Sequence, residues 1–394
     1  MIPPSITTKP ACDAEAFARV RTVFMENFSM GRECGAGLSI WHHGREVLSL
    51  AAGHRDADRT LPWKPDTPCL VWSATKGPSS ACVLFVLKQC GLSPASGVSR
   101  FWPEFAASGK ASITVEDVLS HQAGLCAVTD RSVDAFDHDA VAAALARQAP
   151  LWQPRTAHGY GPRAFGYLLD EMVRRLTGRT LGQVWREAFA EPLGLDFWIG
   201  TPAELHSRVA TILPPKATAI VGQGREFDRA LAEPGTLTHG AFSTPVGLSG
   251  ISVMNTPRIR SACLPAIGGI GSAHALAKFY SAILTESTPI SVNELTERRV
   301  NDEDLVLKLP TAFSLGFMLD PLDSGTKLRT TFGPSLDAFG HPGAGGSLAF
   351  ADPENAISFA YVPNQMEPGV LPRERTRRLV NALYADALPN IRPS

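Results

Sequence analysis

The periodicity of apolar and polar residues predicts helices near both ends of the chain and through its middle. Apolar side chains recur at helical spacing from Asp13 to Phe28, from Ala164 to Thr177 and from Arg373 to Leu388. An alanine-rich segment predicts a further helix from Asp137 to Gln148, and another is expected over Ala273–Leu284. Because the first helix has an apolar side that needs cover, we expect a sheet to pack against it.

Four segments have the alternation and composition of β-strands. Ala36–His42 and Glu46–Ala52 are joined by a short turn that contains glycine, which is typical of a β-hairpin. Gly346–Ala351 and Ala356–Val362 are joined by Asp352–Asn355, a second favourable hairpin turn. Strands near both ends can share one antiparallel sheet only if the helical middle is an insertion. The pattern therefore predicts an α/β (α+β) fold with a helical lobe over one edge of the sheet.

Composition narrows the class of protein. The chain of 394 residues has a formal net charge of −1 and 44% hydrophobic residues, so it can form one large domain or two interleaved ones. Lys and Arg are scattered among Asp and Glu, which argues against a nucleic-acid partner. No apolar run approaches the roughly 20 residues that span a bilayer, and Met1–Cys12 lacks the pattern of a secretory signal. We expect a cytoplasmic protein that does not bind membranes.

Cysteine and histidine spacing gives no sign of a disulfide framework or a metal site. The cysteines are odd in number and have no C-x-x-C spacing, and the histidines form no H-x-x-x-H or H-x-H pair. We expect reduced, buried thiols and no metal. The seven cysteines are Cys12, Cys34, Cys69, Cys82, Cys90, Cys126 and Cys263.

The segment from Val71 to Lys76 stands directly before the longest apolar run. Ser79–Cys90 has few helix breakers, and Gly91 fits a C-terminal cap, so a buried helix is expected here. If this helix begins at or just before Ser73, Ser73 and Lys76 lie one turn apart on the same face. A lysine with a lowered pKa can take the proton of a serine hydroxyl. This arrangement favours Ser73 as a nucleophile and Lys76 as its base.

The S-x-x-K spacing alone is a weak signal. Ser324–Lys327 has the same spacing, but it contains glycine and follows Pro321, which indicates a turn without catalytic meaning. The alternative for Ser73 is a helix N-cap, with Lys76 as a solvated residue of the first turn.

Three motifs in order resemble those of the class C β-lactamase-like serine hydrolases. They are Ser73-Ala74-Thr75-Lys76 before a helix, Tyr160 before a second long helix, and His341-Pro342-Gly343 before a C-terminal hairpin. Val118–Leu125 and Glu191–Leu195 also resemble segments of this group, which includes family VIII carboxylesterases, D-amino-acid-specific peptidases and some acyltransferases. The resemblance implies a serine β-lactamase/transpeptidase-like fold, an antiparallel sheet flanked by N- and C-terminal helices plus an inserted helical lobe, and no cofactor.

The resemblance assigns a role to each motif residue. Ser73 would be acylated, and Lys76 with Tyr160 would form the proton-transfer pair. A tyrosine acts as a base near neutrality only if a neighbouring cation favours its phenolate, which Lys76 could do. The backbone N–H groups of Ser73 and Ala344 would form an oxyanion hole. The alternative for Tyr160 is a half-buried aromatic residue at a helix start.

The candidate substrate-binding residues are His341, Gly343, Trp72 and Pro162. Glycines in the third motif would leave room for a substrate along the strand, although they could instead serve a turn. The family often has Tyr-x-Asn where this chain has Tyr160-Gly161-Pro162, so an amide that contacts the acyl side chain of β-lactams is absent. His341 replaces a lysine that would hold a substrate carboxylate, and histidine is mostly neutral at pH 7. Both departures favour uncharged esters.

The expected domains follow from the order of elements. Residues 1–72 and 250–394 would form a discontinuous sheet domain, residues 73–249 a mainly helical domain, and the active site would lie in the cleft between them. Thr201–Ser261 has no steady hydrophobic period, so we expect long loops there. Such loops often shape a substrate pocket, but a solvated connection is an equal alternative.

The favoured function is hydrolysis of small carboxylic esters through a Ser73 acyl-enzyme, which water or another alcohol or amine resolves. Alternatives within the family are an amidase or D-amino-peptidase and a weak β-lactamase. An alternative from another class is a catalytically silent scaffold that binds a partner or self-assembles. The absence of G-x-S-x-G disfavours an α/β-hydrolase. The oligomeric state and the choice among ester, amide and thioester donors stay open.

Overall fold

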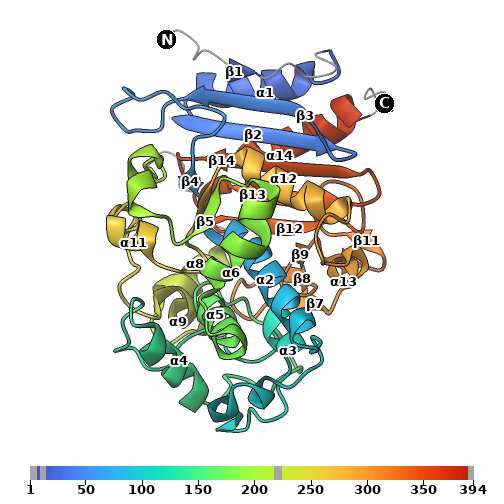
Figure 1. Ribbon diagram of the computed structural model, residues 1–394. Helices are drawn as coiled ribbons and strands as arrows, with labels where there is room; N and C mark the ends of the chain where they lie inside the picture. The colour runs from blue at the N-terminus through green and yellow to red at the C-terminus, as the bar shows by residue number, and fades with distance from the viewer. Residues whose placement is uncertain (1–6, 9–14, 217–223, 389–394) are drawn as a thin grey trace.

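In the residues that the computed structural model describes (7–8, 15–216 and 224–388), one antiparallel sheet has nine strands. Figure 1 shows most of this sheet in the upper half of the molecule. The strands, in spatial order, are β1 (Thr7–Thr8), β3 (Arg45–Gly53), β2 (Gly35–His42), β14 (Ile357–Pro363), β13 (Leu348–Asp352), β12 (Phe339–Pro342), β9 (Met318–Leu319), β8 (Pro310–Phe313) and β7 (Val300–Glu303). Because β14 pairs with β2, with Tyr361 opposite Leu38, the predicted sharing of one sheet by both ends of the chain is confirmed.

Strand β14 explains why helices cover both faces of the sheet. Phe359 and Tyr361 point to one face and belong to the apolar cluster that includes α1 (Ala18–Ser29) and α14 (Glu374–Ala382). Ala360 and Val362 point to the other face, against α12 (Ala273–Leu284). The predicted terminal helices therefore pack on one face together. The start expected for the first helix at Asp13 lies outside the described residues.

The inserted part of the chain forms the helical lobe. Helix α2 is buried along most of its length and packs on α5, which also contacts α4 and α3. Figure 1 shows α3, α4 and α5 at the end of the molecule away from β2 and β3. The helices are α2 (Lys76–Gln89), α3 (Val115–Leu119), α4 (His138–Arg147), α5 (Ala164–Thr177), α6 (Leu181–Trp185) and α7 (Glu191–Leu193).

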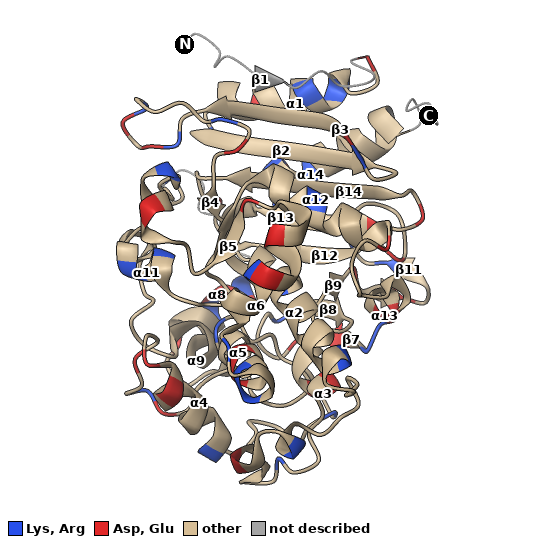
Figure 2. Cartoon of the chain, in the orientation of Figure 1, with Lys and Arg blue, Asp and Glu red and all other residues tan. Residues whose placement is uncertain are grey.

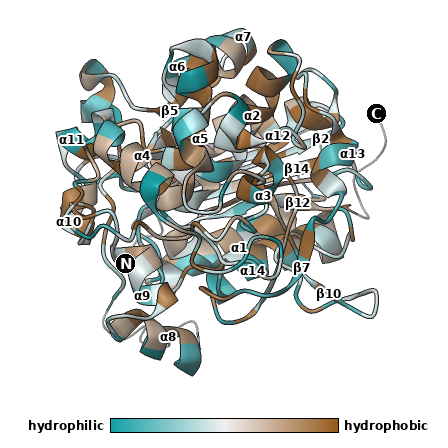
Figure 3. Cartoon of the chain, turned by 90° about the horizontal axis from the view of Figure 1, so that it is seen from below, coloured by the Kyte–Doolittle hydropathy of each residue, from teal (hydrophilic) through white to brown (hydrophobic). Residues whose placement is uncertain are grey.

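The segment Thr201–Ser261 differs from the expected long loops. It forms a 3₁₀ helix and several short α-helices, while residues 217–223 lie outside the described residues. Thr236 and Thr256 start α9 and α11 by accepting N–H groups of the first turn, so caps rather than hydrophobic period fix these helices. The elements are Ala203–Arg208 (3₁₀), α8 (Arg225–Ala232), α9 (Leu237–Ser243), α10 (Ile251–Met254) and α11 (Pro257–Ser261). Helix α8 lies at the periphery and is largely hydrophilic (Figure 3).

In the cartoon of Figure 2, segments with Lys and Arg are scattered among segments with Asp and Glu. Among the described residues, no helix is long and apolar enough to cross a membrane. The six cysteines within this part are unpaired thiols, in line with the prediction. Most are buried, but Cys90 is exposed and Cys263 is partly exposed. Cys12 lies outside the described residues.

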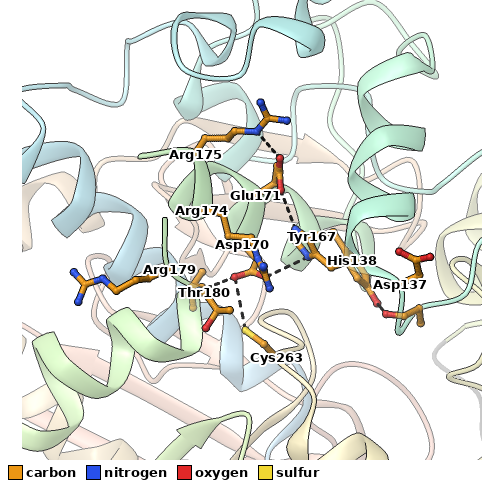
Figure 4. Close-up of polar contacts among 12 residues, drawn as sticks. Asp137, His138, Tyr167, Asp170, Glu171, Arg174, Arg175, Arg179, Thr180 and Cys263 are labelled. Atoms are coloured by element: carbon orange, nitrogen blue, oxygen red, sulfur yellow. Dashed lines mark hydrogen bonds and ion pairs between the residues drawn. The ribbon is translucent and has the colours of Figure 1, made fainter. Parts of the chain in front are cut away.

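A buried network of charges joins the helices of the lobe (Figure 4). Asp170 and Glu171 are consecutive on α5 and are only 1% and 7% exposed. His138 of α4 lies between them, with Nδ1 3.2 Å from Asp170 Oδ2 and Nε2 2.9 Å from Glu171 Oε2. Asp170 also accepts the N–H of Leu181 at 2.6 Å, where α6 begins, and pairs with Arg174 at 2.9 Å. One carboxylate thus ties together three helices of the lobe.

Candidate active site

Ser73 lies in a single 3₁₀ turn, Trp72–Thr75, at the entry to α2. The turn follows β4 (Cys69–Leu70), which pairs with β6 (Gly269–Gly271), and β6 also pairs with β5 (Phe197–Ile199). Gly269 holds both ends of the turn, because its carbonyl accepts the N–H of Val71 at 2.9 Å and its N–H donates to Thr75 Oγ1 at 2.8 Å. Helix α2 therefore begins three residues after Ser73, at Lys76.

Lys76 is fully buried, and its amine has three polar contacts. Its Nζ lies 3.3 Å from Ser73 Oγ, 3.2 Å from the carbonyl oxygen of Pro162 and 3.0 Å from that of Ala266. The contact between Ser73 and Lys76 expected from the spacing of three is present. An uncharged amine can donate its two N–H groups to the two carbonyls, which leaves its lone pair for the proton of Ser73.

The electrostatics of Lys76 and Tyr160 favour neutral forms of both. Burial lowers the pKa of Lys76 well below its usual range. Burial also raises the pKa of Tyr160; the nearby Ser73 hydroxyl opposes this rise, and the charge of Asp304 adds to it. The expectation that a charged Lys76 favours the Tyr160 phenolate is therefore not met, because the amine loses its charge in the same buried environment.

Tyr160 is held between the two halves of the site. Its ring lies 4.6 Å from Lys76 Nζ, stacks on Phe313 of β8 at 6.2 Å, and is 5.9 Å from the ring of His341. Within the described residues the phenol oxygen has no hydrogen-bond partner of good geometry. The Ser73 hydroxyl is nevertheless close enough to lower the pKa of Tyr160. His121 accepts the N–H of Gly161 on Nδ1 at 3.3 Å. The phenol is thus buried, fixed in direction and free to bond a reacting group.

His341 of β12 has a buried, uncharged side chain whose ring lies near that of Tyr160. Its Nδ1 is 2.7 Å from the carbonyl oxygen of Pro342, so Nδ1 carries the proton and Nε2 is an acceptor. Burial and the neighbouring Lys76 lower the pKa of His341 to about 3, against a smaller opposing effect of the Pro342 carbonyl. Nε2 is buried and has no partner in the part of the chain that the structure describes. This side chain can accept a hydrogen bond but offers no positive charge.

Gly343 is required by close backbone packing. A Cβ at this position would lie 2.2 Å from the carbonyl oxygen of Val71 and 2.1 Å from Ser347 Oγ. The missing side chain of Gly343 therefore makes room for the carbonyl before the Ser73 turn, a role that differs both from the expected substrate space and from the turn given as its alternative. Ser347 Oγ also donates to the Val71 carbonyl at 2.8 Å. These contacts bring Ala344 to the Ser73 turn.

The two N–H groups expected in the oxyanion hole are available for a ligand. Among the described residues, the backbone N–H groups of Ser73 and Ala344 donate to no other part of the chain. Ala344 begins a short 3₁₀ turn, Ala344–Gly346, which α14 holds from behind. Arg375 Nη2 donates to the carbonyl of Gly345 at 2.6 Å, and Thr376 Oγ1 donates to that of Gly346 at 2.7 Å.

The other predicted residues have different surroundings. Pro162 is buried and contributes its carbonyl to Lys76, while Trp72 is partly buried, with a φ of 53° and, among the described residues, no partner for its indole N–H. Ser324 and Lys327 do not meet, because Ser324 contacts Asp323 and Lys327 pairs with Asp320 at 3.0 Å. They form the small hairpin of β10 (Leu322–Asp323) and β11 (Thr326–Lys327), as expected for a turn.

Comparison with known proteins agrees with this fold. A family model described as beta-lactamase matches residues 21–384. Over 363 residues the chain is 31% identical to the "Esterase/beta-lactamase LipL" of Mycobacterium tuberculosis (strain ATCC 25618 / H37Rv), a match that covers 89% of this chain and 81% of LipL. The protein is thus a serine hydrolase with the β-lactamase/transpeptidase-like fold. The chain belongs to the beta-lactamase family, so the resemblance seen in the sequence is confirmed.

Two solved structures are similar over almost the whole chain. A penicillin-binding protein homologue from Caulobacter crescentus has a TM-score of 0.83 and 35% identity, and the match covers 96% of this chain and 100% of that chain. A family VIII carboxylesterase has a TM-score of 0.83 and 34% identity, with 96% of this chain and 99% of that chain covered.

Proposed function

We propose that this protein hydrolyses small, uncharged carboxylic esters through an acyl-enzyme on Ser73. The observation that carries the proposal is the environment of Lys76, whose buried amine contacts Ser73 Oγ and two backbone carbonyls. A base for a serine nucleophile must have a lone pair directed at the hydroxyl and a lowered pKa, and this amine has both.

In the proposed acylation step, Ser73 Oγ attacks the ester carbonyl while its proton passes to Lys76 Nζ. The carbonyl oxygen becomes negative and receives the N–H groups of Ser73 and Ala344. When the C–O bond to the alcohol breaks, the phenol of Tyr160 gives its proton to the leaving oxygen, and the Lys76 ammonium returns a proton to the phenolate. Both side chains end the step neutral, the state that their burial favours.

Deacylation repeats these transfers with water in place of the alcohol. Water gives a proton through Tyr160 to Lys76, its oxygen attacks the acyl carbon, and the proton returns to Ser73 Oγ as the carboxylic acid leaves. A second alcohol or amine could take the place of water, in which case the acyl group would be transferred.

The preference for uncharged substrates rests on His341. Its neutral imidazole, only 1% exposed, cannot neutralise a substrate carboxylate, and bringing one beside it would bury an unpaired charge. The similarity to a family VIII carboxylesterase supports the same choice. Amides and β-lactams are the alternatives within the family.

We also propose that the sheet part (residues 1–72 and 250–394) and the helical part (73–249) act as two domains with the site between them. Ser73, Lys76 and Tyr160 belong to the helical part, whereas His341 and Ala344 belong to the sheet part. The contacts across this boundary support the division, because neither part contains all five residues.

The test of the function is turnover of a short p-nitrophenyl ester by Ser73→Ala. Loss of detectable turnover is expected in a folded protein, together with loss of labelling by a fluorophosphonate. Ser324→Ala is the matched control, since Ser324 has the same S-x-x-K spacing without the contact, and it should retain full activity. Retained turnover in Ser73→Ala would contradict the proposal. A folded wild-type chain that fluorophosphonate leaves unmodified would favour the silent scaffold.

A further inference from the structure

Asp304 is a fully buried carboxylate directly behind Tyr160. It follows β7, and both of its oxygens accept the backbone N–H of Tyr160 at 3.1 Å. Oδ1 also accepts the N–H groups of Val306 and Leu307 at 2.8 Å each. The neighbouring backbones are joined as well, because the N–H of Leu305 donates to the carbonyl of His158 at 3.0 Å. The carboxylate therefore sits where the chain before Tyr160 meets the chain after β7.

A chain of polar contacts links this carboxylate to the sheet. Thr311 Oγ1 on β8 donates to Asp304 Oδ2 at 3.1 Å and lies 2.7 Å from His158 Nε2. Because the Thr311 proton goes to Asp304, the hydroxyl accepts from His158, whose Nε2 carries the proton. Two residues further along β8, Phe313 stacks on the ring of Tyr160. The same strand thus supports the backbone and the ring of Tyr160.

No lysine or arginine among the described residues forms an ion pair with Asp304; the nearest basic group is His158, 3.7 Å away. A buried carboxylate is costly; here the N–H and O–H groups that donate to it offset that cost, and the more distant charge of Arg329 adds to their effect. The position of this charge beside Tyr160 indicates a functional role for Asp304.

We propose that Asp304 is a positioning residue for catalysis, which holds Tyr160 so that its phenol stays beside Ser73 and over Lys76. The inference rests on the proposed function, in which the phenol gives its proton to the leaving oxygen. Burial is the larger cause of the raised pKa of Tyr160, and the negative charge of Asp304 raises it further. Both effects keep the phenol protonated for this step. His121 supports the other side, since its carbonyl accepts the N–H of Gly159 at 3.1 Å and its Nδ1 that of Gly161.

The test is a double-mutant cycle in the full chain with Asp304→Asn, Tyr160→Phe and both together. In Asp304→Asn, an amide N–H faces the N–H of Tyr160, so the phenol moves. We expect kcat for the p-nitrophenyl ester to fall about 10- to 100-fold, with KM changed less than about threefold. In the Tyr160→Phe background, which has no phenol to misplace, Asp304→Asn should lower kcat less than about twofold.

The control separates positioning from stability. Asp320 is also fully buried and accepts two backbone N–H groups, from Thr331 at 3.0 Å and Phe332 at 3.1 Å. Asp320→Asn should lower the unfolding temperature and leave kcat of the folded protein unchanged. Equal losses of kcat from Asp304→Asn in both backgrounds, or no loss in either, would overturn the inference.

Thr311→Val takes the place of Asp304→Asn in the cycle if that variant does not fold. It removes one donor from the carboxylate, and a loss of kcat of about two- to tenfold that vanishes in the Tyr160→Phe background is expected. An additive loss would overturn the inference. Turnover that survives Ser73→Ala would instead overturn the proposed function, so the two failures are distinct.

Discussion

Burial decides the charge of Lys76, and with it the direction in which a proton can move. The amine touches no carboxylate among the described residues, and its polar contacts are Ser73 Oγ and the carbonyls of Pro162 and Ala266. A surface lysine would be charged and could not accept a proton at neutral pH. In the interior the uncharged form is favoured, which is the form that the proposed role as a base requires.

The pH dependence of kcat/KM should report this change. Activity requires the unprotonated amine. We therefore expect kcat/KM to be lost as the pH falls through the lowered pKa of Lys76 and to be constant at higher pH. The plateau should be reached well below the usual lysine pKa of about 10.4. Measuring kcat/KM for an uncharged ester against pH checks this. An acidic limb at the usual lysine value would contradict the assignment. Lys76→Arg, which cannot lose its proton, should lower kcat by about 100-fold or more.

A spacing of three residues predicts the contact between Ser73 and Lys76, because residues three apart in a helix lie on the same face. The spacing could not predict that the carbonyls of Pro162 and Ala266 contact Lys76, since every residue has a backbone oxygen and the side-chain pattern does not distinguish these two. Asp304 was also missed. It ends the acidic run Asp302-Glu303-Asp304, and nothing in the sequence distinguishes the buried carboxylate from its two exposed neighbours.

Among the elements, strand β12 and the 3₁₀ turn after it depend on contact with the turn of Ser73. Gly343 lies against the carbonyl of Val71, and α14 fixes the carbonyls of Gly345 and Gly346 through Arg375 and Thr376. The N–H of Ala344 is therefore aimed by two elements that come from opposite ends of the sequence. A shift in either contact would move one donor of the proposed oxyanion hole.

Gly343→Ala tests this contact. The new Cβ would overlap the Val71 carbonyl, so the free energy of unfolding should fall by about 1 to 3 kcal/mol, and turnover should fall with it as Ala344 moves. Gly97→Ala is the matched control, because Gly97 has a φ of −62° and its Cβ would come no closer than 3.8 Å to Ser99 Oγ. Urea unfolding and ester turnover of both variants are the measurements. Equal behaviour of the two variants would contradict the steric explanation.

Elements with several periods were predictable, and short ones were not. Ala164–Thr177 and Ala273–Leu284 have the predicted bounds, since three turns of helix give a clear apolar face. Helices α9 and α11 have at most two turns, too few for a period to appear, and only their threonine caps mark them. The 3₁₀ turn at Ser73 was likewise expected as plain helix.

At the scale of the molecule, the charged network of Figure 4 holds the lobe that carries Tyr160. Asp170→Asn leaves Arg174 and His138 without their shared carboxylate, so the free energy of unfolding should fall by about 3 kcal/mol. Arg179→Ala is the control; its ion pair with Glu187 is about half exposed on both sides, and a change below about 1 kcal/mol is expected. Chemical unfolding followed by circular dichroism measures both. Similar losses would contradict the role given to burial.

The site as a whole could be predicted only through the family resemblance. Ser73, Tyr160 and His341 are far apart in sequence, and no spacing rule connects them. Hydrophobic period gives the layers of the fold, but it does not say which loop faces which strand. The three motifs supplied that information because their order resembles that of the family to which the chain belongs.

The pairing of β2 with β14 has a consequence for how the chain is made. On the ribosome, the hairpin of β2 and β3 emerges early, with the outer edge of β2 unpaired. Strand β14, which pairs with this edge in the folded protein, is synthesised only near the end. At about 5 to 20 residues per second, that edge waits for tens of seconds. During this interval it can pair with another nascent chain, so the yield of native protein in a cell should depend on chaperones that shield it.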